Sequence, residues 1–152
     1  MLTGVFEDPN GEYPAGTYAR HPPGSSHAAW SKPGCELLVK LRQFDEEDSA
    51  WVKIDMADES GWSTDACGNR RLALHEFGRE TVCALDLTAP AAPVAYPHGA
   101  ELFVLDGSLT VNDTTATAGA WFRLPPDSEL TLIPQSGATA RIWMKLGHLS
   151  FA

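Results

Sequence analysis

Histidines that lie close to acidic residues are the first candidates for chemistry in this chain, and two such pairs occur. His98 and Glu101 are three positions apart, so they could share a cation if His98 lies in a turn. On a continuous strand they would point to opposite faces, because side chains alternate with a period of two. His75 and Glu76 begin an H-E-x-x-H pattern, but Arg79 occupies the position of the second histidine. We expect His98 and Glu101 to lie at the surface or at a pocket mouth. We do not expect His75 and Glu76 to form a zinc-protease motif.

Other reactive side chains give little support for catalysis. No G-x-S-x-G nucleophile elbow, G-x-G-x-x-G loop or phosphate-binding loop occurs in the sequence. The two serines before His27 belong to a proline–glycine turn rather than to an oriented triad. Cys35, Cys67 and Cys83 are odd in number and have no C-x-x-C spacing, which predicts reduced and mostly buried thiols. The residues therefore predict no catalytic side chain.

Composition limits the classes of partner. The chain has 152 residues, 43% hydrophobic and 20% charged, which is typical of a globular protein about one domain long. Its net charge of −9 repels phosphate backbones and anionic lipids, so we expect neither a nucleic acid nor a membrane surface as partner. No apolar run approaches the roughly 18 residues of a membrane helix, and the first residues lack a signal-peptide pattern. We expect a cytoplasmic protein.

Short runs rich in β-branched and aromatic residues must position any site. They are separated by turn sequences containing glycine, proline and asparagine, and several alternate with a period of two. This pattern predicts an all-β antiparallel sandwich or barrel. The nine expected strands are residues 35–44, 50–56, 71–77, 81–87, 100–106, 108–111, 120–124, 129–133 and 140–146.

The sequence also contains an internal repeat. Segments that begin at Gly4 and at Gly107 each reach a second glycine twelve residues later, followed by an arginine and a pair of prolines. Both segments end on a strand-like run, and Lys145 lies 105 positions after Lys40, whereas Gly107 lies 103 positions after Gly4. Shared glycines and prolines over about forty residues indicate two copies of one unit.

The first copy resembles a known family. The segment Gly16-(x5)-Pro22-x-Gly24-(x2)-His27 reproduces the second motif of the cupin superfamily, and residues 4–44 are similar to ChrR-type cupins, the cupin modules of anti-sigma factors. The second half resembles the same family more loosely. The resemblance implies cupin-type antiparallel jelly-roll barrels in tandem: one complete C-terminal barrel and an N-terminal half barrel. We expect the boundary between residues 1–48 and 49–152, with the acidic run 45–48 as a solvated connection.

The resemblance also implies a metal ligand at His27, with Zn, Fe or Mn as the expected cofactor. The family's first motif, H-x-H-(x3–4)-E-(x6)-G, would precede Gly4 and is not in this sequence. Three alternatives are open for His27: it binds a metal within one chain, it shares a site completed by a partner subunit or an upstream segment, or it is a motif histidine hydrogen-bonded to a polar neighbour. We expect His21 at the rim of this region.

The second copy has lost the family's ligand positions. Alignment on Gly107 places Val94, Tyr96 and Ala100 at the positions of the first-motif ligands, and Leu130 at the position of the second-motif histidine. The C-terminal barrel is therefore expected to have a packed interior or a small apolar pocket rather than a catalytic site. Its candidate pocket residues are Tyr96, Trp121 and Arg123.

Two classes of function follow from these expectations. The first is a non-catalytic ChrR-like cupin, a regulatory or sensory module with a protein partner or a small ligand; the H-x3-C-x2-C signature of the sigma-contacting domain does not occur in the sequence. The second is a metal-dependent, dioxygenase-like enzyme with its site at His27. A structural dimerisation remnant is a third possibility. Since a half barrel exposes strand edges, we expect a homodimer.

Overall fold

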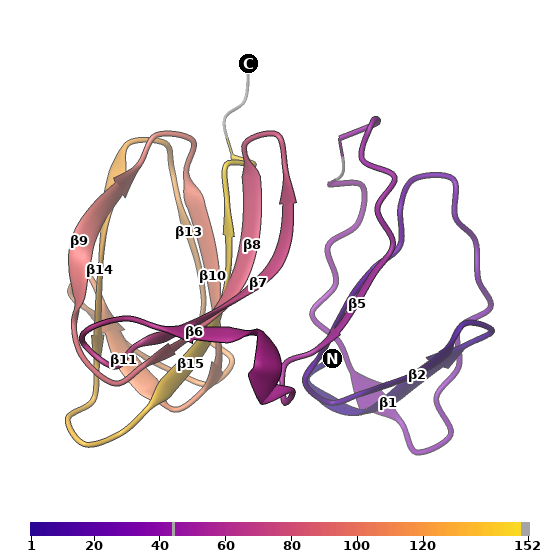
Figure 1. The fold of residues 1–152 in the computed structure, drawn as a ribbon, viewed down its shortest axis with the longest axis horizontal. Coiled ribbons are helices and arrows are strands. Elements are labelled where there is room, and N and C mark those ends of the chain that lie inside the picture. Colours follow the sequence, from indigo (N-terminus) through magenta and orange to yellow (C-terminus); the bar gives the residue numbers. More distant parts are fainter. Residues whose placement is uncertain (44, 150–152) are drawn as a thin grey trace. The chain divides into compact units, whose positions relative to one another are not determined.

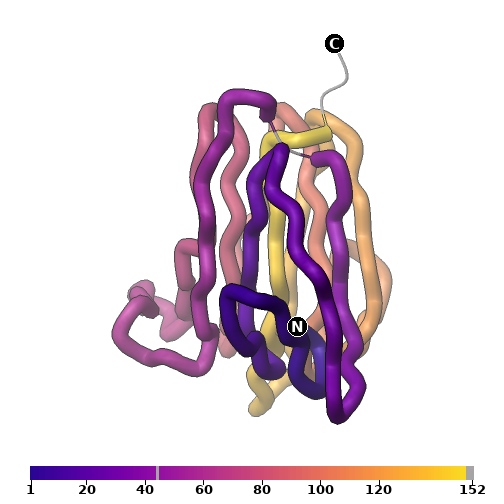
Figure 2. Tube along the Cα trace, turned by 90° about the vertical axis from the view of Figure 1, so that its right-hand side faces the viewer, coloured from indigo at the N-terminus to yellow at the C-terminus, as the bar shows by residue number. Residues whose placement is uncertain are grey.

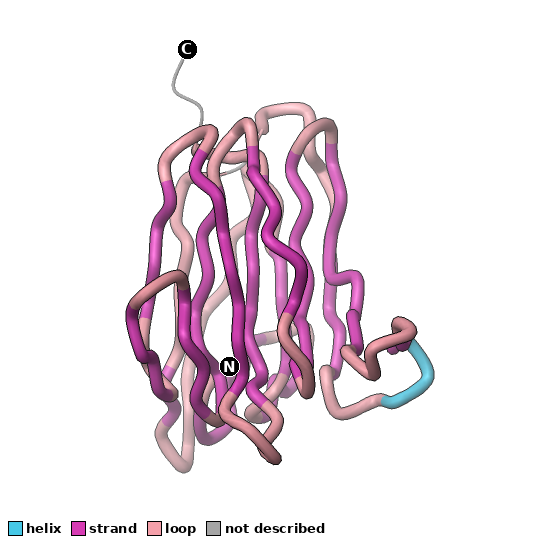
Figure 3. Tube along the Cα trace, turned by 90° about the vertical axis from the view of Figure 1, so that its left-hand side faces the viewer, coloured by secondary structure: helices cyan, strands magenta, loops and turns pink. Residues whose placement is uncertain are grey.

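The computed structural model describes residues 1–43 and 45–149, and almost all of its regular structure is β-strand (Figures 1 and 3). Within these residues the only helical element is a short 3-10 turn, η1 (Glu59–Gly61). Every strand pairing is antiparallel. The expected all-β antiparallel class is confirmed. No helix of the described part has the length and apolarity needed to cross a membrane.

The chain divides into two compact units, Met1–Glu59 and Ser60–Ala152. The first unit, drawn in indigo to purple in Figure 2, has five strands: β1 (Thr3–Asp8), β2 (Gly11–Pro14), β3 (Thr17–Arg20), β4 (Cys35–Glu36) and β5 (Val52–Asp55). They form a three-stranded sheet in the order β2-β1-β4 and a two-stranded sheet of β3 and β5.

Strand β5 belongs to the first unit because it pairs with β3. The register joins Thr17 to Asp55 and Arg20 to Val52. The boundary predicted from the sequence lies before β5, at residue 48, and the acidic run 45–48 is predicted to be solvated. Asp48 is instead only 1% exposed and forms an ion pair with the buried guanidinium of Arg20. The edge of β3 is thus covered by a later segment of the same unit.

The strand expected over residues 35–44 is mostly absent. Only Cys35 and Glu36 form a strand, residues 37–43 are irregular, and Phe44 lies outside the described residues. The corresponding segment of the second unit, β15 (Ala140–Leu146), pairs with one neighbouring strand along its full length and with the other over residues 141–146. Residues 37–43 have no such ladder among the described residues, so their apolar pattern alone does not make them a strand.

The second unit consists of two facing sheets. One has six strands in the order β13-β10-β15-β8-β7-β6, and the other has four in the order β12-β11-β14-β9. The strands are β6 (Trp62–Thr64), β7 (Arg70–Phe77), β8 (Glu80–Leu87), β9 (Ala91–Tyr96), β10 (Ala100–Asp106), β11 (Ser108–Val111), β12 (Thr114–Thr117), β13 (Trp121–Leu124), β14 (Ser128–Pro134) and β15.

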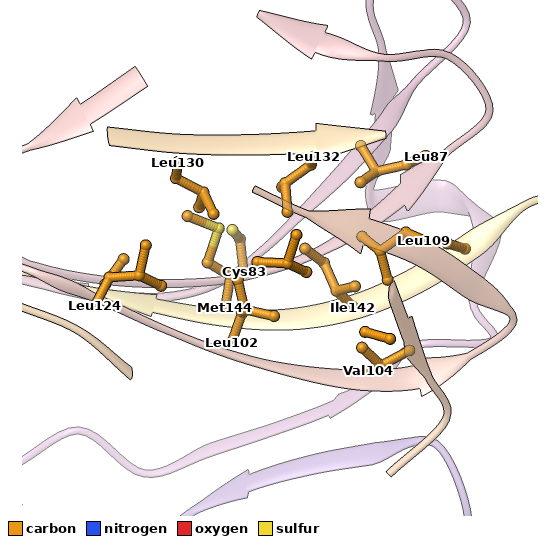
Figure 4. Packing of buried hydrophobic residues seen from close by; sticks show 14 residues of the cluster. Cys83, Leu87, Leu102, Val104, Leu109, Leu124, Leu130, Leu132, Ile142 and Met144 are labelled. Atoms are coloured by element: carbon orange, nitrogen blue, oxygen red, sulfur yellow. The ribbon is translucent and has the colours of Figure 1, made fainter. Parts of the chain in front are cut away.

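The interior of the second unit is filled with apolar side chains. Leu102, Ile142 and Met144 from the six-stranded sheet pack with Leu130 and Leu132 from the other sheet (Figure 4). The first three are at most 1% exposed. Along β7 and β14, buried residues alternate with more exposed ones, as the period-two pattern predicted. The interior of the second unit is therefore a packed hydrophobic core.

The two segments that the internal repeat relates, beginning at Gly4 and at Gly107, share backbone geometry. Gly4 and Gly107 both have positive φ, 69° and 76° respectively. A Cβ on Gly4 would collide with the backbone carbonyl of Gly34, and one on Gly107 with that of Thr139.

Eight of the nine expected strands are present, with ends shifted by at most two residues. Six further strands of the described residues were not expected: β1, β2, β3, β6, β9 and β12.

Candidate metal centre

Asp8 reaches the interior of the first unit at the end of β1. The chain reverses there through Asp8-Pro-Asn-Gly11, and Asp8 Oδ1 accepts a hydrogen bond of 2.7 Å from the backbone N–H of Asn10. Such a side-chain bond to the backbone two residues later favours a tight turn. The Tyr13 hydroxyl donates to the same oxygen at 3.3 Å. The carboxylate is thus buried, 3% exposed as a residue, and held in place from two sides.

The two histidines come from the segment that follows β3. His21 is the first residue after that strand, and the Pro22-Pro23 turn then reverses the chain. Ser25 closes the turn, because its N–H and its hydroxyl both donate to the carbonyl of Pro22, at 3.1 and 2.6 Å. This reversal returns His27 to the side of the unit on which His21 lies.

Asp8, His21 and His27 converge on one point. His27 Nδ1 lies 2.7 Å from Asp8 Oδ2, and His21 Nε2 lies 3.8 Å from the same oxygen. The two imidazole rings are 4.5 Å apart between centroids and nearly perpendicular, at 83°. One ligand atom from each residue lies within 4.8 Å of the other two. Among residues 1–43 and 45–149, this is the one group of three or more such residues that could hold a metal ion.

Electrostatics favour the protonation states that bind a metal. Burial raises the pKa of Asp8, but the hydrogen bonds it accepts from His27, Asn10 and Tyr13 lower it by more, so the group is a carboxylate. The pKa of His21 is lowered, first by burial and then by repulsion from His27, with Asp8 acting in the opposite direction. His21 is therefore a neutral imidazole at neutral pH, the form that coordinates metals.

The donor set fits a first-row divalent cation. Two imidazoles and one carboxylate are ligands of zinc and of non-haem iron(II), at about 2.0–2.2 Å from the metal. Tetrahedral ligands at that distance are about 3.4 Å apart, so the 2.7 Å contact between Asp8 and His27 would have to open slightly on metal binding. Side-chain exposures of 19% for His21 and 29% for His27 leave the group accessible to an ion.

The corresponding positions of the second unit hold aliphatic side chains. By the offset of 103 residues, Asp8 corresponds to Val111, His21 to Leu124 and His27 to Leu130. All three are buried members of the hydrophobic core. The interior positions that form a packed core in the second unit therefore form a polar cluster in the first.

The residues expected to line a pocket in the second unit do not surround one cavity. Tyr96 packs against the hydrophobic core. Trp121 and Arg123 alternate on β13 with Phe122 and Leu124, which contact the core, so both lie on the opposite face of the sheet and are exposed. That placement follows from the period of two along the strand.

Glu101 is not at the surface, contrary to the expectation for the His98–Glu101 pair. Its residue exposure is 0%, and its carboxylate accepts hydrogen bonds from Trp121 Nε1 at 2.6 Å and from His148 Nε2 at 2.8 Å. His98 is exposed, and its backbone carbonyl, not its side chain, bonds Leu149. His98 and Glu101 therefore form no shared site.

Sequence reasoning found His27 but missed Asp8 and assigned His21 to the rim. Asp8 was treated only as part of a turn, and no motif spacing connects it to the histidines. A signal was nevertheless present in the repeat. At three positions where the second copy has Val111, Leu124 and Leu130, the first copy has polar residues of types that can bind metals.

Comparisons with known proteins agree with this fold. The model of the ChrR cupin-like domain matches residues 1–45, the segment that contains all three residues of the cluster. No curated protein matches the chain.

Several of the solved structures that resemble the chain are described as cupins. The complex of Rhodobacter sphaeroides SigE with the anti-sigma ChrR matches at 16% identity and a TM-score of 0.54, over 59% of this chain and 51% of that one. The chain thus spans about half the length of that relative. An RmlC-like cupin of Shewanella frigidimarina matches at 14% identity and 0.51, over 59% and 85%. A candidate acetylacetone dioxygenase of Methylibium petroleiphilum matches at 16% and 0.51, over 56% and 69%. The chain therefore has a cupin-type fold, and its residues 1–45 match the ChrR cupin-like domain, as the sequence resemblance indicated.

Proposed function

We propose that this chain is a metal-binding cupin module in which Asp8, His21 and His27 hold one divalent cation. The observation that carries the proposal is the convergence of these three side chains within 4.8 Å in the first unit. Further support comes from the match of residues 1–45 to the ChrR cupin-like domain, since that match spans all three.

Each residue has a distinct role in this proposal. His27 and His21 supply imidazole nitrogens, and Asp8 supplies the negative charge that balances part of the charge of the cation. Tyr13 and the backbone N–H of Asn10 hold the carboxylate in place by hydrogen bonds, as groups behind the ligands of a metal site commonly do. When bound, the ion provides a Lewis-acidic centre with at least one position open to a small molecule.

A regulatory or sensory role is the function that the observations favour. The ChrR protein in the similar structure is described as an anti-sigma factor, and the second unit holds a packed apolar core rather than polar residues for catalysis. In this proposal the metal centre of the first unit binds a ligand, and binding changes the affinity of the module for a protein partner.

A metal-dependent enzyme is the second candidate. The observation in its favour is the donor set itself, because two histidines and one carboxylate leave open the positions that non-haem iron(II) oxygenases use. Oxygen consumption by the Fe(II)-loaded protein, measured with a panel of small organic acids, distinguishes the candidates. Saturable, substrate-dependent consumption that is lost in His27→Ala would favour the enzyme over the regulatory module.

Calorimetric titration of the metal-stripped protein with Zn²⁺ tests the proposal. We expect about one ion per chain, in line with a single three-ligand site. Removing a group that only hydrogen-bonds a metal ligand lowers the metal affinity about 10- to 100-fold. Removing a ligand itself, as in His27→Ala or His21→Ala, should therefore lower the Zn²⁺ affinity by about 100-fold or more. His98→Ala, at an exposed histidine of the second unit, is the matched control and should bind like the parent. Equal binding by His27→Ala and the parent would refute the metal centre.

A further inference from the structure

Strand β5 brings an aromatic ring and a cation beside the metal centre. Its register places Val52 opposite Arg20, so the preceding residue, Trp51, lies beside His21. Their ring centroids are 4.9 Å apart. Two residues further along the same face, Lys53 Nζ lies 4.6 Å from the centroid of the Tyr13 ring.

Neither side chain is occupied in stabilising a core. Trp51 is 54% exposed although it is the largest type of apolar side chain, and Lys53 is exposed as well. Within residues 1–43 and 45–149, no carboxylate forms an ion pair with Lys53. The Lys53 ammonium lies over the ring of Tyr13, the residue whose hydroxyl donates to Asp8. The region thus combines a flat apolar surface with an unpaired positive charge.

The charges around the metal centre favour an anionic ligand. A divalent ion on one carboxylate and two neutral imidazoles leaves a local charge of about +1, and Lys53 adds another. The rest of the chain is strongly acidic, with a net charge of −9, so a small anion would find few other attractive positions on it. Three protein ligands leave room on the ion for an oxygen of such an anion.

We propose that Trp51 and Lys53 form the ligand subsite of the metal centre, and that the ligand is a small carboxylate with a flat, unsaturated or aromatic body. The carboxylate occupies the open side of the ion and faces the ammonium of Lys53, while its body stacks on the indole of Trp51. This inference rests on the metal centre proposed above and adds the chemical class of molecule that reaches it.

The test uses the Co²⁺-loaded protein, whose visible absorption reports on the ligands of the ion. Benzoate is the probe, and benzamide is its neutral counterpart with the same ring. We expect benzoate to change the spectrum saturably and benzamide to leave it unchanged. Lys53→Gln should weaken benzoate binding about fivefold, the most that an exposed ion pair usually contributes, and Lys53→Arg should restore it. Trp51→Ala should weaken it by about fivefold through the lost ring contact.

The controls separate this inference from the metal centre. Lys32→Gln changes another exposed lysine of the first unit and should bind benzoate like the parent. Calorimetry should give all these variants the parent's affinity for Co²⁺. If Co²⁺ binds normally but benzoate has no effect, benzamide acts equally, or Lys53→Gln binds benzoate like the parent, the subsite is refuted and the metal centre stands. If Co²⁺ fails to bind through Asp8, His21 and His27, both proposals fall together.

Discussion

His27 Nδ1 lies 2.7 Å from Oδ2 of Asp8, a carboxylate that solvent does not reach. In the second unit the corresponding residues are Leu130 and Val111, which pack within a hydrophobic core. The same interior positions thus contain an ionisable pair in one unit and hydrocarbon in the other. Burying a carboxylate is costly unless it is hydrogen-bonded or bound to a metal, and the retention of this polar pair in the first unit is in line with the metal centre proposed above.

Replacing Asp8 by asparagine tests the contribution of its charge. The amide preserves the shape of the side chain but removes the anionic ligand, so Zn²⁺ affinity should fall about 100-fold or more, as for loss of any ligand. Calorimetric titration gives the affinity, and circular dichroism shows whether the fold is retained. A folded Asp8→Asn protein with the parent's Zn²⁺ affinity would show that Asp8 is not a ligand.

The stability of the metal-stripped protein should fall as the pH is lowered from 7 to 5. Below about 6.5 the unfolded chain binds a proton at His21, whose folded-state pKa is lowered, so acid favours unfolding. The contribution of Asp8, whose pKa is also lowered, is present above about 3.8 and is lost only at more acidic pH. His21 accounts for at most about 1.4 kcal/mol per pH unit.

Urea denaturation followed by tryptophan fluorescence at pH 7 and pH 5 measures this effect. His21→Gln removes the group concerned, so the variant should lose less stability between the two pH values than the parent does. An identical pH dependence in His21→Gln would show that His21 does not titrate differently in the folded and unfolded states.

The buried pair of Arg20 and Asp48 should be important for the first unit. Their side chains are 5% and 1% exposed, so Asp48→Ala would leave a buried guanidinium without its carboxylate. Such a loss typically destabilises a protein by about 3–5 kcal/mol. Denaturant titration measures the change, and Glu46→Ala, at an exposed position of the same acidic run, should have little effect. Equal stability of the two variants would argue against the pair.

The three cysteines should differ in reactivity toward a thiol reagent. Cys67 is exposed, Cys35 is partly buried and Cys83 is buried in the core of the second unit. Burial raises the pKa of Cys83, partly offset by Arg71, and so reduces the thiolate that reacts. Labelling followed by mass spectrometry of peptides should show Cys67 modified first and Cys83 only in denaturant. Early modification of Cys83 would contradict the packed core.

The extent of successful prediction follows from the range of the interactions involved. Most strands of the second unit were predictable because alternating side chains and flanking turns are local signals, as along β7 and β14. Residues 37–43 also have an apolar sequence, but within residues 1–43 and 45–149 no strand pairs with them, and a ladder depends on partners distant in sequence.

The same reason explains the candidate site. His27 was found from a motif contained within twelve residues, whereas Asp8 reaches it through a hairpin and Trp51 through the pairing of β5 with β3. No local pattern encodes these approaches. The repeat contained part of the information, because it aligns Asp8 and His21 with aliphatic residues, but only the fold shows that these positions face one interior.

Anomalous diffraction from crystals of the Zn²⁺-loaded protein tests the central claim most directly. The account predicts one ion per chain, within about 2.0–2.2 Å of a carboxylate oxygen of Asp8 and of one imidazole nitrogen each from His21 and His27. An ion bound elsewhere on the chain, or an anomalous map with no peak among these three side chains, would contradict it.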